Sequence, residues 1–372
     1  MRKIRVAHLI TSLTVGGAQS MLYKLVAGMD RSLFESHVIS MTDGGTMAPE
    51  FEKLGVAVSS LGMRPGSPNP VGVLRLRRLL ERANIDVLQT WLYHSDLLGT
   101  LTALTLGKLP VLWNIRCSTM GPEHERLQMR VILFLLVRLS QRPTAVVVNS
   151  VAGKKVHQIF GYVPRRWELI ANGFQLTAGA DAAARSALGF APDDVVFAMV
   201  ARDDPIKDHL TFLQAARSLL TSVPRARFML VGEGVTPDTP KYASWAADPV
   251  LGRRLHLLGE RRDVTWLLGA VDCLVSTSLG EGLPSVVGEA MAAGVPCIAT
   301  DVGDTARLMA DTGILISPGR PRELASAMER MAEDSSLRHS LGTKAKERIE
   351  RDYSLEAAIK TYENLYRSAV AS

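Results

Sequence analysis

Two glutamates, Glu281 and Glu289, lie eight positions apart in the stretch LGEGLPSVVGEAMAAGVP. Glu289 follows a proline that suits a first helical turn, so the positive end of a helix dipole explains an acid there. Glu281 precedes the helix and stands between two glycines, where the dipole gives it no benefit. A carboxylate in such a loop can reach a sugar, and the backbone N–H groups of Leu283 and Ser285 can hold phosphate oxygens.

Two cations, Arg202 and Lys207, stand five residues apart in VARDDPIKDHL, directly after an expected strand. A guanidinium binds two oxygens and an ammonium supplies a point charge, so together they suit a diphosphate. The alternative is a solvated turn in which the lysine pairs with Asp203 or Asp208. The position at the carboxyl end of a strand favours the diphosphate.

Weaker signals follow other expected strands. The pair Gly16 and Gly17 lets the backbone approach a ligand and offers helix N–H groups to an anion, but a plain turn explains it equally well. His94 and Arg116 follow later strands, and each also fits a residue that binds no ligand. LLGERRDV, around Arg261, turns from a strand into a helix and could meet a nucleotide base mainly through its backbone. The glycine pair is not the G-x-G-x-x-G fingerprint, which argues against a nicotinamide dehydrogenase.

All these candidates belong to an alternating pattern of strands and helices. Short β-rich runs alternate with helical runs from KIRVAHLI to PTAVVVNS, and the pattern restarts at DDVVFAMVARDD. Such alternation predicts doubly wound parallel sheets, which bind ligands outside the carboxyl ends of their strands. An Ala/Gly-rich stretch at 169–194 divides the two series. We therefore expect an α/β fold of two facing Rossmann-like domains, with the site in an interdomain cleft.

The length and composition fit this expectation. A chain of 372 residues is long enough for two domains, and its 3 cysteines lack metal-ligand or disulfide spacing, which favours a reducing cytoplasm. The apolar run near the start breaks after about eight residues without a cleavage pattern, so it predicts a strand rather than a signal peptide. We expect no membrane span, because no stretch reaches roughly 18 uninterrupted apolar residues.

Charge is distributed unevenly along the chain. Residues 1–172 carry 21 Lys and Arg against 11 Asp and Glu, whereas the remaining residues carry 22 against 26. A basic first half suggests anionic partners, either membrane headgroups or a phosphorylated ligand. Nucleic acid is not expected, because the chain has no nucleic-acid-binding motif and few aromatics among its basic clusters. The segment EHERLQMRVILFLLVRLSQR mixes Arg with Leu, Ile and Phe, and fits either an interfacial helix or a core helix.

Taken together, these residues resemble glycosyltransferase family 4, the retaining enzymes of the GT-B fold. The resemblance covers nearly the whole chain, and its most specific part is the E-x7-E element in EGLPSVVGEAMAAGVPCIATDVG. The other matching features are the Gly-Gly loop, Asn172-Gly173, the R-x4-K pair, GEG at 232–234 and the C-terminal YSLEAAIKTYENLY. The resemblance implies an acceptor-side domain over 1–172, with the helix 353–372 packing back on it, and a donor-binding domain over 173–352.

The resemblance also implies roles for individual residues. Glu281 would bind the donor sugar and steady developing charge, and His94 would contact the sugar near the reacting face. Glu289 would bind the ribose. The implied donor-binding set is Gly16, Gly17, Arg202, Lys207, Arg261, Leu283, Ser285 and Glu289. No cofactor and no dedicated metal are implied.

Two departures from the family pattern are visible. Gln19 stands where a glutamate is usual after the glycine pair. VGDTARLM replaces the commoner double glycine and later glutamate with Asp304 and Arg307, in a segment that lies close to the donor in the family. The second departure puts the choice of donor in question.

The resulting hypothesis is a cytoplasmic, retaining transferase of hexose-type sugars, working at the inner face of the cell membrane. The donor would be a nucleotide-diphosphate sugar, with a UDP-sugar as the default. The acceptor would be a lipid-linked or cell-surface glycan precursor, and peripheral contact with anionic membrane belongs to the hypothesis. The alternatives are a GT-B epimerase or synthase that acts on a soluble nucleotide sugar or sugar phosphate, and a non-catalytic sugar-binding protein of the same fold.

Overall fold

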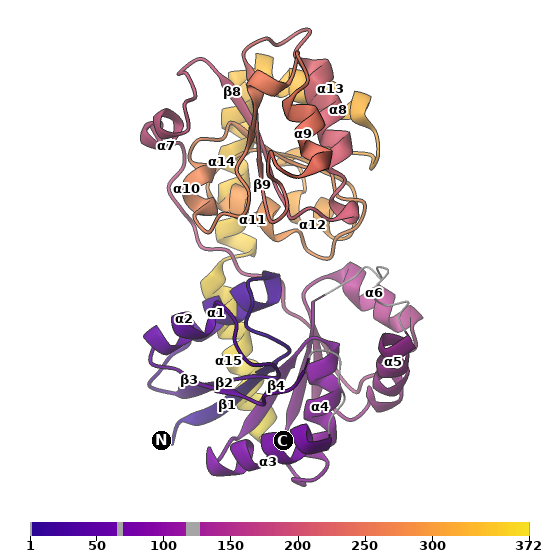
Figure 1. Ribbon diagram of the computed structural model, residues 1–372. Helices are drawn as coiled ribbons and strands as arrows, with labels where there is room; N and C mark the ends of the chain where they lie inside the picture. The colour runs from indigo at the N-terminus through magenta and orange to yellow at the C-terminus, as the bar shows by residue number, and fades with distance from the viewer. Residues whose placement is uncertain (1, 65–69, 117–126, 372) are drawn as a thin grey trace. The chain divides into compact units, whose positions relative to one another are not determined.

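The computed structural model describes residues 2–64, 70–116 and 127–371, which form two compact units (Figure 1). Unit 1 comprises Met1–Gly173 and Leu355–Ser372, and unit 2 comprises Phe174–Ser354. Each unit contains one all-parallel sheet with helices against it. The fold class predicted from the alternating pattern, α/β with Rossmann-like units, is confirmed.

The sheet of unit 1 has the order β3-β2-β1-β4-β5-β6-β7, so the direction of strand addition reverses between β1 and β4. Its strands are β1 (Ile4–Ile10), β2 (Phe34–Ser40), β3 (Ala57–Ser60), β4 (Val87–Trp91), β5 (Val111–Ile115), β6 (Ala145–Val148) and β7 (Trp167–Leu169). Its helices are α1 (Gly17–Gly28), α2 (Ala48–Lys53), α3 (Pro70–Arg82), α4 (Tyr93–Ala103), α5 (Leu127–Leu139), α6 (Val151–Ile159) and α15 (Leu355–Ala371). The central strands are buried on both faces, which explains their nearly continuous apolar sequences.

Alternate residues of β1 serve two separate cores. Val6 and Ile10 pack with α1 and α15, whereas Ala7 and Leu9 pack with α3, α4 and α5. The helix α15 contributes Ile359, Tyr362, Leu365, Tyr366 and Ala369 to the first of these cores. A segment that follows unit 2 in sequence therefore completes one face of unit 1.

Buried polar contacts fix α15 on this face. The Tyr366 hydroxyl donates to Gln89 Oε1 in β4. The Tyr362 hydroxyl accepts from Asn114 Nδ2 and from Arg116 Nη2, both at 3.1 Å. Arg116, considered above as a possible ligand residue, is thus engaged in holding α15.

The sheet of unit 2 has the order β10-β9-β8-β11-β12-β13, which reverses between β8 and β11. Its strands are β8 (Val195–Val200), β9 (Ala226–Val231), β10 (Leu255–Leu257), β11 (Cys273–Ser276), β12 (Cys297–Thr300) and β13 (Gly313–Ile316). Its helices are α7 (Ala182–Ala187), α8 (His209–Leu219), α9 (Pro240–Ala246), α10 (Val264–Leu268), α11 (Ser285–Ala292), α12 (Thr305–Met309), α13 (Pro321–Glu333) and α14 (Ser335–Asp352). A large core cluster joins β8 and β9 to α8 and α13.

Several local expectations need correction. The stretch 169–194, read as aperiodic, contains α7, whose start is capped by the Asp181 carboxylate. The edge strands β7 and β13 were not anticipated. Pro284 is the N-cap of α11 rather than part of its first turn. Over the described ranges, no helix is long and apolar enough to span a bilayer.

Candidate functional site

The reversal point of unit 2 brings two loops together at the carboxyl edge of its sheet. A short 3-10 turn, Pro205–Lys207, follows β8, and the loop 277–284 follows the adjacent strand β11. The Thr277 hydroxyl donates to the backbone carbonyls of Lys207 and Asp208 at 3.0 and 2.9 Å. Leu279 N donates to Ile206 O at 2.7 Å. Open α/β sheets bind ligands at this position, which makes the pair of loops the candidate site of unit 2.

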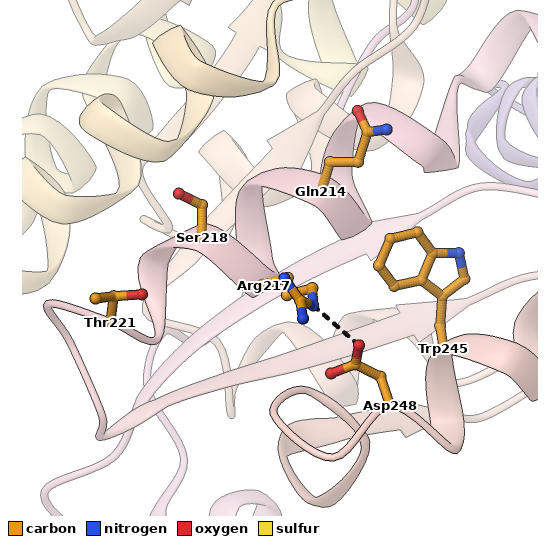
Figure 2. Close-up of a pocket in the computed structure, with 6 residues that line it drawn as sticks. All are labelled: Gln214, Arg217, Ser218, Thr221, Trp245 and Asp248. Atoms are coloured by element: carbon orange, nitrogen blue, oxygen red, sulfur yellow. Dashed lines mark hydrogen bonds and ion pairs between the residues drawn. The ribbon is translucent and has the colours of Figure 1, made fainter.

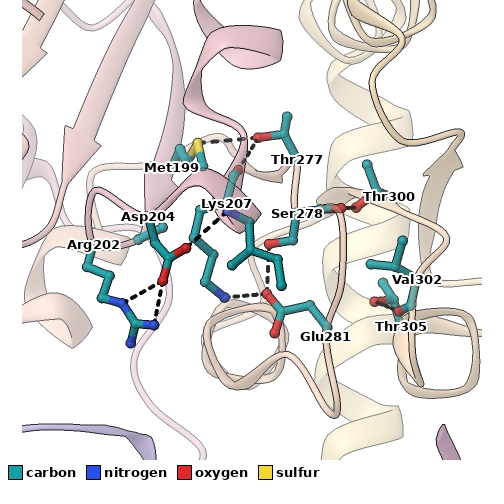
Figure 3. Close-up of polar contacts among 12 residues, drawn as sticks. Met199, Arg202, Asp204, Lys207, Thr277, Ser278, Glu281, Thr300, Val302 and Thr305 are labelled. Atoms are coloured by element: carbon teal, nitrogen blue, oxygen red, sulfur yellow. Dashed lines mark hydrogen bonds and ion pairs between the residues drawn. The ribbon is translucent and has the colours of Figure 1, made fainter. Parts of the chain in front are cut away.

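An ion pair between Lys207 and Glu281 lies in the middle of these loops (Figure 3). Lys207 Nζ donates to Glu281 Oε1, and Ser278 Oγ donates to the same oxygen at 2.7 Å. The two side chains are only 23% and 15% exposed. The lysine therefore pairs with neither Asp203 nor Asp208, the partners weighed from the sequence. An ammonium and a carboxylate held together at a sheet edge can meet a ligand that carries both negative charge and hydroxyl groups.

Arg202 is close to this pair but makes a separate contact. Its guanidinium donates from Nε and Nη2 to Asp204 Oδ2 at 3.1 and 2.6 Å, and its side chain is 63% exposed. Burial raises the pKa of the Asp204 carboxyl, but hydrogen bonds from Arg202 and from Ile206 N outweigh that effect and lower it. Arg202 thus projects from the same edge as a solvent-accessible cation.

The carboxyl end of β12 supports the loop that carries Glu281. Thr300 Oγ1 donates to Ser278 O at 2.6 Å, and Asp304 N donates to Gly282 O at 2.8 Å. Gly303 has φ +60°, and a Cβ there would lie 2.0 Å from Glu281 O. Only glycine fits this close approach. The sequence does not predict these supporting residues as site residues, although Asp304 is one of its departures from the family pattern.

The remaining predicted residues of unit 2 occupy two places. Glu289 lies half-buried in the second turn of α11, and Leu283 and Ser285 flank the N-cap of the same helix. The positive end of α11 therefore adjoins the Glu281 loop. Arg261 follows the edge strand β10 and pairs with Asp263 at 2.6 Å. In the described part of the chain, no hydrogen bond joins Arg261 to the Lys207–Glu281 pair.

Unit 1 has an equivalent edge at its own reversal point. Gly16 and Gly17 begin α1 after β1, and His94 lies in the first turn of α4 after the neighbouring strand β4. A Cβ at Gly17 would meet nothing within 4 Å, so the space beside that backbone is open. Leu92 has φ +75°, and such strain is often found where function requires it. Burial lowers the pKa of His94, so its imidazole is neutral near pH 7.

A buried carboxyl group lies two residues beyond His94. Asp96 is fully buried, and it accepts a hydrogen bond from the Thr90 hydroxyl. Burial raises the pKa of Asp96 to about 8. The folded chain therefore binds this proton more tightly than the unfolded chain does, so the contribution of Asp96 to stability is fully present below about pH 4 and is lost as the pH rises through about 8.

We expect Asp96→Asn to remove this decline. The amide oxygen can still accept from Thr90, and no charge has to be buried at any pH. In thermal unfolding between pH 5 and 8, the melting temperature of the variant should rise relative to that of the wild type, by about 5 °C or more at pH 8. Parallel curves of melting temperature against pH for the two proteins would contradict the prediction.

Unit 2 also has a surface depression that is separate from the loops around Lys207 and Glu281 (Figure 2). It is open, and it is lined by Gln214, Arg217, Ser218, Thr221, Trp245 and Asp248. The second half of α8 leads back to the amino end of β9, so this depression lies away from the carboxyl edge. Arg217 and Asp248 satisfy each other at 2.9 Å, and none of the predicted site residues lines it. Among the described residues, no cluster of His, Cys, Asp or Glu that could hold a metal ion is found.

Two Rossmann-like units with polar loops at their reversal points define a GT-B fold. Residues 15–177 match the model described as Glycosyltransferase Family 4, and residues 194–334 match the one described as Glycosyl transferases group 1. The chain therefore belongs to the group 1, family 4 glycosyltransferases.

Individual relatives agree with this membership. A UDP-Gal:alpha-D-GlcNAc-diphosphoundecaprenol alpha-1,3-galactosyltransferase of Escherichia coli is 26% identical over 310 residues, 81% of this chain and 80% of that protein. The putative glycosyltransferase EpsF of Bacillus subtilis is 27% identical over 80% of this chain and 79% of its own length.

Solved structures share the fold. HepE of Anabaena, in complex with UDP-glucose, has a TM-score of 0.84 at 21% identity and covers 98% of this chain and 100% of its own. Sucrose-phosphate synthase of Thermosynechococcus elongatus has a TM-score of 0.81 at 18% identity, covering 99% and 100%.

Proposed function

We propose that this glycosyltransferase moves a hexose-type sugar from a nucleotide-diphosphate donor, UDP-sugar by default, to a lipid-linked or cell-surface glycan precursor. The observation that carries the proposal is the Lys207–Glu281 pair at the reversal point of unit 2. A cation that meets the diphosphate and a carboxylate that meets the sugar are held together by the protein before any donor arrives.

The transfer proceeds with retention. The acceptor oxygen bonds to the anomeric carbon on the face from which the diphosphate leaves, as the bond from that carbon to the diphosphate oxygen breaks. The proton of the acceptor hydroxyl passes to the departing diphosphate oxygen. Negative charge grows on the departing diphosphate, where Lys207, Arg202 and the start of α11 stabilise it electrostatically. Glu281 stabilises the positive charge that develops on the sugar.

The other predicted residues complete the donor site. Glu289 binds the ribose, and the loop around Arg261 meets the base through its backbone. From unit 1, His94 contacts the sugar, and the backbone at Gly16 and Gly17 approaches the diphosphate. The neutral state of the His94 imidazole suits a hydrogen bond to a sugar hydroxyl.

The relatives support the choice of donor and acceptor. The name of the Escherichia coli relative specifies UDP-Gal as donor and a diphosphoundecaprenol-linked sugar as acceptor. An acceptor of that kind would support our proposal that this chain acts in the cytoplasm, at the inner face of the membrane.

A soluble acceptor is the second candidate. The D-inositol 3-phosphate glycosyltransferase of Rhodococcus erythropolis is 28% identical over 237 residues, 59% of this chain. Its name specifies a small phosphorylated acceptor, and the basic first half of this chain suits one as well.

A thermal-shift panel of nucleoside diphosphates and nucleotide sugars tests the donor site. A donor at 100 times its Kd adds about 2.7 kcal/mol of stability, and this corresponds to a shift of roughly 5–10 °C. The shift should be lost in Arg202→Ala and kept in Arg217→Ala, a matched control. Arg217 is also an exposed arginine paired to an aspartate in unit 2, but it lies away from the carboxyl edge. If no nucleotide stabilises the wild type, the proposed function is wrong.

A further inference from the structure

The helix α5 exposes apolar side chains on the side that faces away from the core. Ile132, Leu133 and Leu136 are buried against the sheet. Leu127, Val131 and Phe134 are between 49% and 77% exposed, and their spacing places them on one face of the helix. A surface helix of a soluble domain normally has a polar outer face. The exposed apolar side chains on the outer face of α5 therefore indicate a surface that binds a partner.

A second exposed apolar segment adjoins the end of α5. Ile159, Phe160 and Val163, at the end of α6 and just beyond, are 84%, 45% and 57% exposed. Val163 N donates to Ser140 Oγ at 3.1 Å, which ties this segment to the residue after α5. We call the six residues Leu127, Val131, Phe134, Ile159, Phe160 and Val163 the apolar face of unit 1.

Positive charge surrounds the apolar face. Residues 127–166 contain seven Lys and Arg residues and no Asp or Glu, and one of the seven, Arg166, pairs with Glu168 just beyond this range. Arg138 lies on the exposed side of α5, with its guanidinium 4.5 Å from the centre of the Phe134 ring. Lys154 belongs to α6, the helix that precedes the second apolar segment. Alternating apolar and cationic groups match the two layers of a bilayer with anionic lipids, its acyl region and its headgroups.

We propose that the apolar face of unit 1 docks on an anionic lipid bilayer. A second copy of the chain is disfavoured, because pairing this face with itself would bring together two sets of cations, Arg138 and Lys154 of each copy among them. The inference rests on the proposed function for its use, since docking would bring the chain to a lipid-linked acceptor. Its evidence is separate, because none of the predicted donor residues belongs to the face.

Vesicle sedimentation of the full chain tests the proposal. The wild type should pellet with vesicles containing about one third phosphatidylglycerol, stay in solution with pure phosphatidylcholine, and be largely released by 0.5 M NaCl. The variant Val131→Glu/Phe134→Glu should bind at least ten-fold more weakly. The matched control is Val71→Glu/Leu74→Glu, which adds the same charges at exposed apolar residues of α3. Its affinity for the vesicles should be within two- to three-fold of that of the wild type.

Further readouts separate the possible outcomes. Leu127→Gln/Val131→Gln repeats the test without added charge, in case the glutamate variant does not fold. All variants should keep the nucleotide-induced thermal shift of the wild type.

If the wild type stays in solution with anionic vesicles, or the control loses binding equally, docking is wrong even where the donor shift persists. Vesicle binding without any donor shift would instead overturn the proposed function and leave docking standing. A dimer that Phe134→Glu dissociates, without vesicle binding, would assign the face to a second copy.

Discussion

Lys207→Met should lower kcat/KM for the donor reaction by a factor of about 10²–10³. The ammonium is the cation that the loops hold beside Glu281, the carboxylate proposed to bind the sugar, so its loss would remove the proposed charge stabilisation from the departing diphosphate. Glu281 would keep its hydrogen bond from Ser278 but, in a half-buried position, would lose the Lys207 ammonium that balances its charge. We therefore also expect a loss of about 1–3 kcal/mol in unfolding free energy.

The double variant Lys207→Met/Glu281→Gln separates the two effects. A neutral amide can still accept from Ser278, so stability should return close to that of the wild type. Activity should remain low, because neither charge is available to the donor. Recovery of activity together with stability would mean that the pair is only a structural ion pair. Lys241→Met, which breaks a lysine–aspartate pair of 2.6 Å in the same unit, should keep activity within a few-fold.

Gly303→Ala should both destabilise unit 2 and weaken donor binding. Its Cβ would lie 2.0 Å from Glu281 O, so the backbone that carries Glu281 must move. Strain of this kind costs about 3 kcal/mol, and it should lower the melting temperature by roughly 6–12 °C. The KM for the donor should rise as well, because the displaced carboxylate no longer meets the sugar.

Gly319→Ala is the matched control for this prediction. Gly319 has nearly the same backbone conformation, with φ +67°, but a Cβ there would meet nothing within 4 Å. This variant should lose only about 1 kcal/mol and keep its KM. Equal losses in the two variants would show that the contact with Glu281 is unimportant.

The sequence predicts the fold well where local patterns are strong. Buried strands such as AVVV and amphipathic helices carry their periodicity in the residues themselves. The missed strands β7 and β13 are only three and four residues long and lie at sheet edges, where half-exposed residues give no clear alternation. The helix α7 is an alanine-rich turn and a half, and its cap at Asp181 was the only local signal.

The site is harder to predict because its contacts join distant segments. Residue types and strand ends singled out Lys207 and Glu281 separately, but they are 74 positions apart, and their pairing depends on β8 and β11 being neighbours. The sequence around the lysine indicates only the neighbouring acids, Asp203 and Asp208, as partners. The close approach at Gly303 depends in the same way on a loop twenty-two positions earlier in the chain.

Unit 1 is discontinuous in sequence, and this affects the order in which the chain can fold during synthesis. The residues up to Gly173 leave the ribosome without Ile359, Tyr362 and Tyr366, which complete one of the cores of unit 1. Unit 2 is made in one piece and can fold as soon as it emerges. Unit 1, although translated first, acquires its full core only after unit 2 has been synthesised. A ribosome that stalls within unit 2 would therefore leave a nascent chain with an open apolar sheet face, a target for chaperones and proteases.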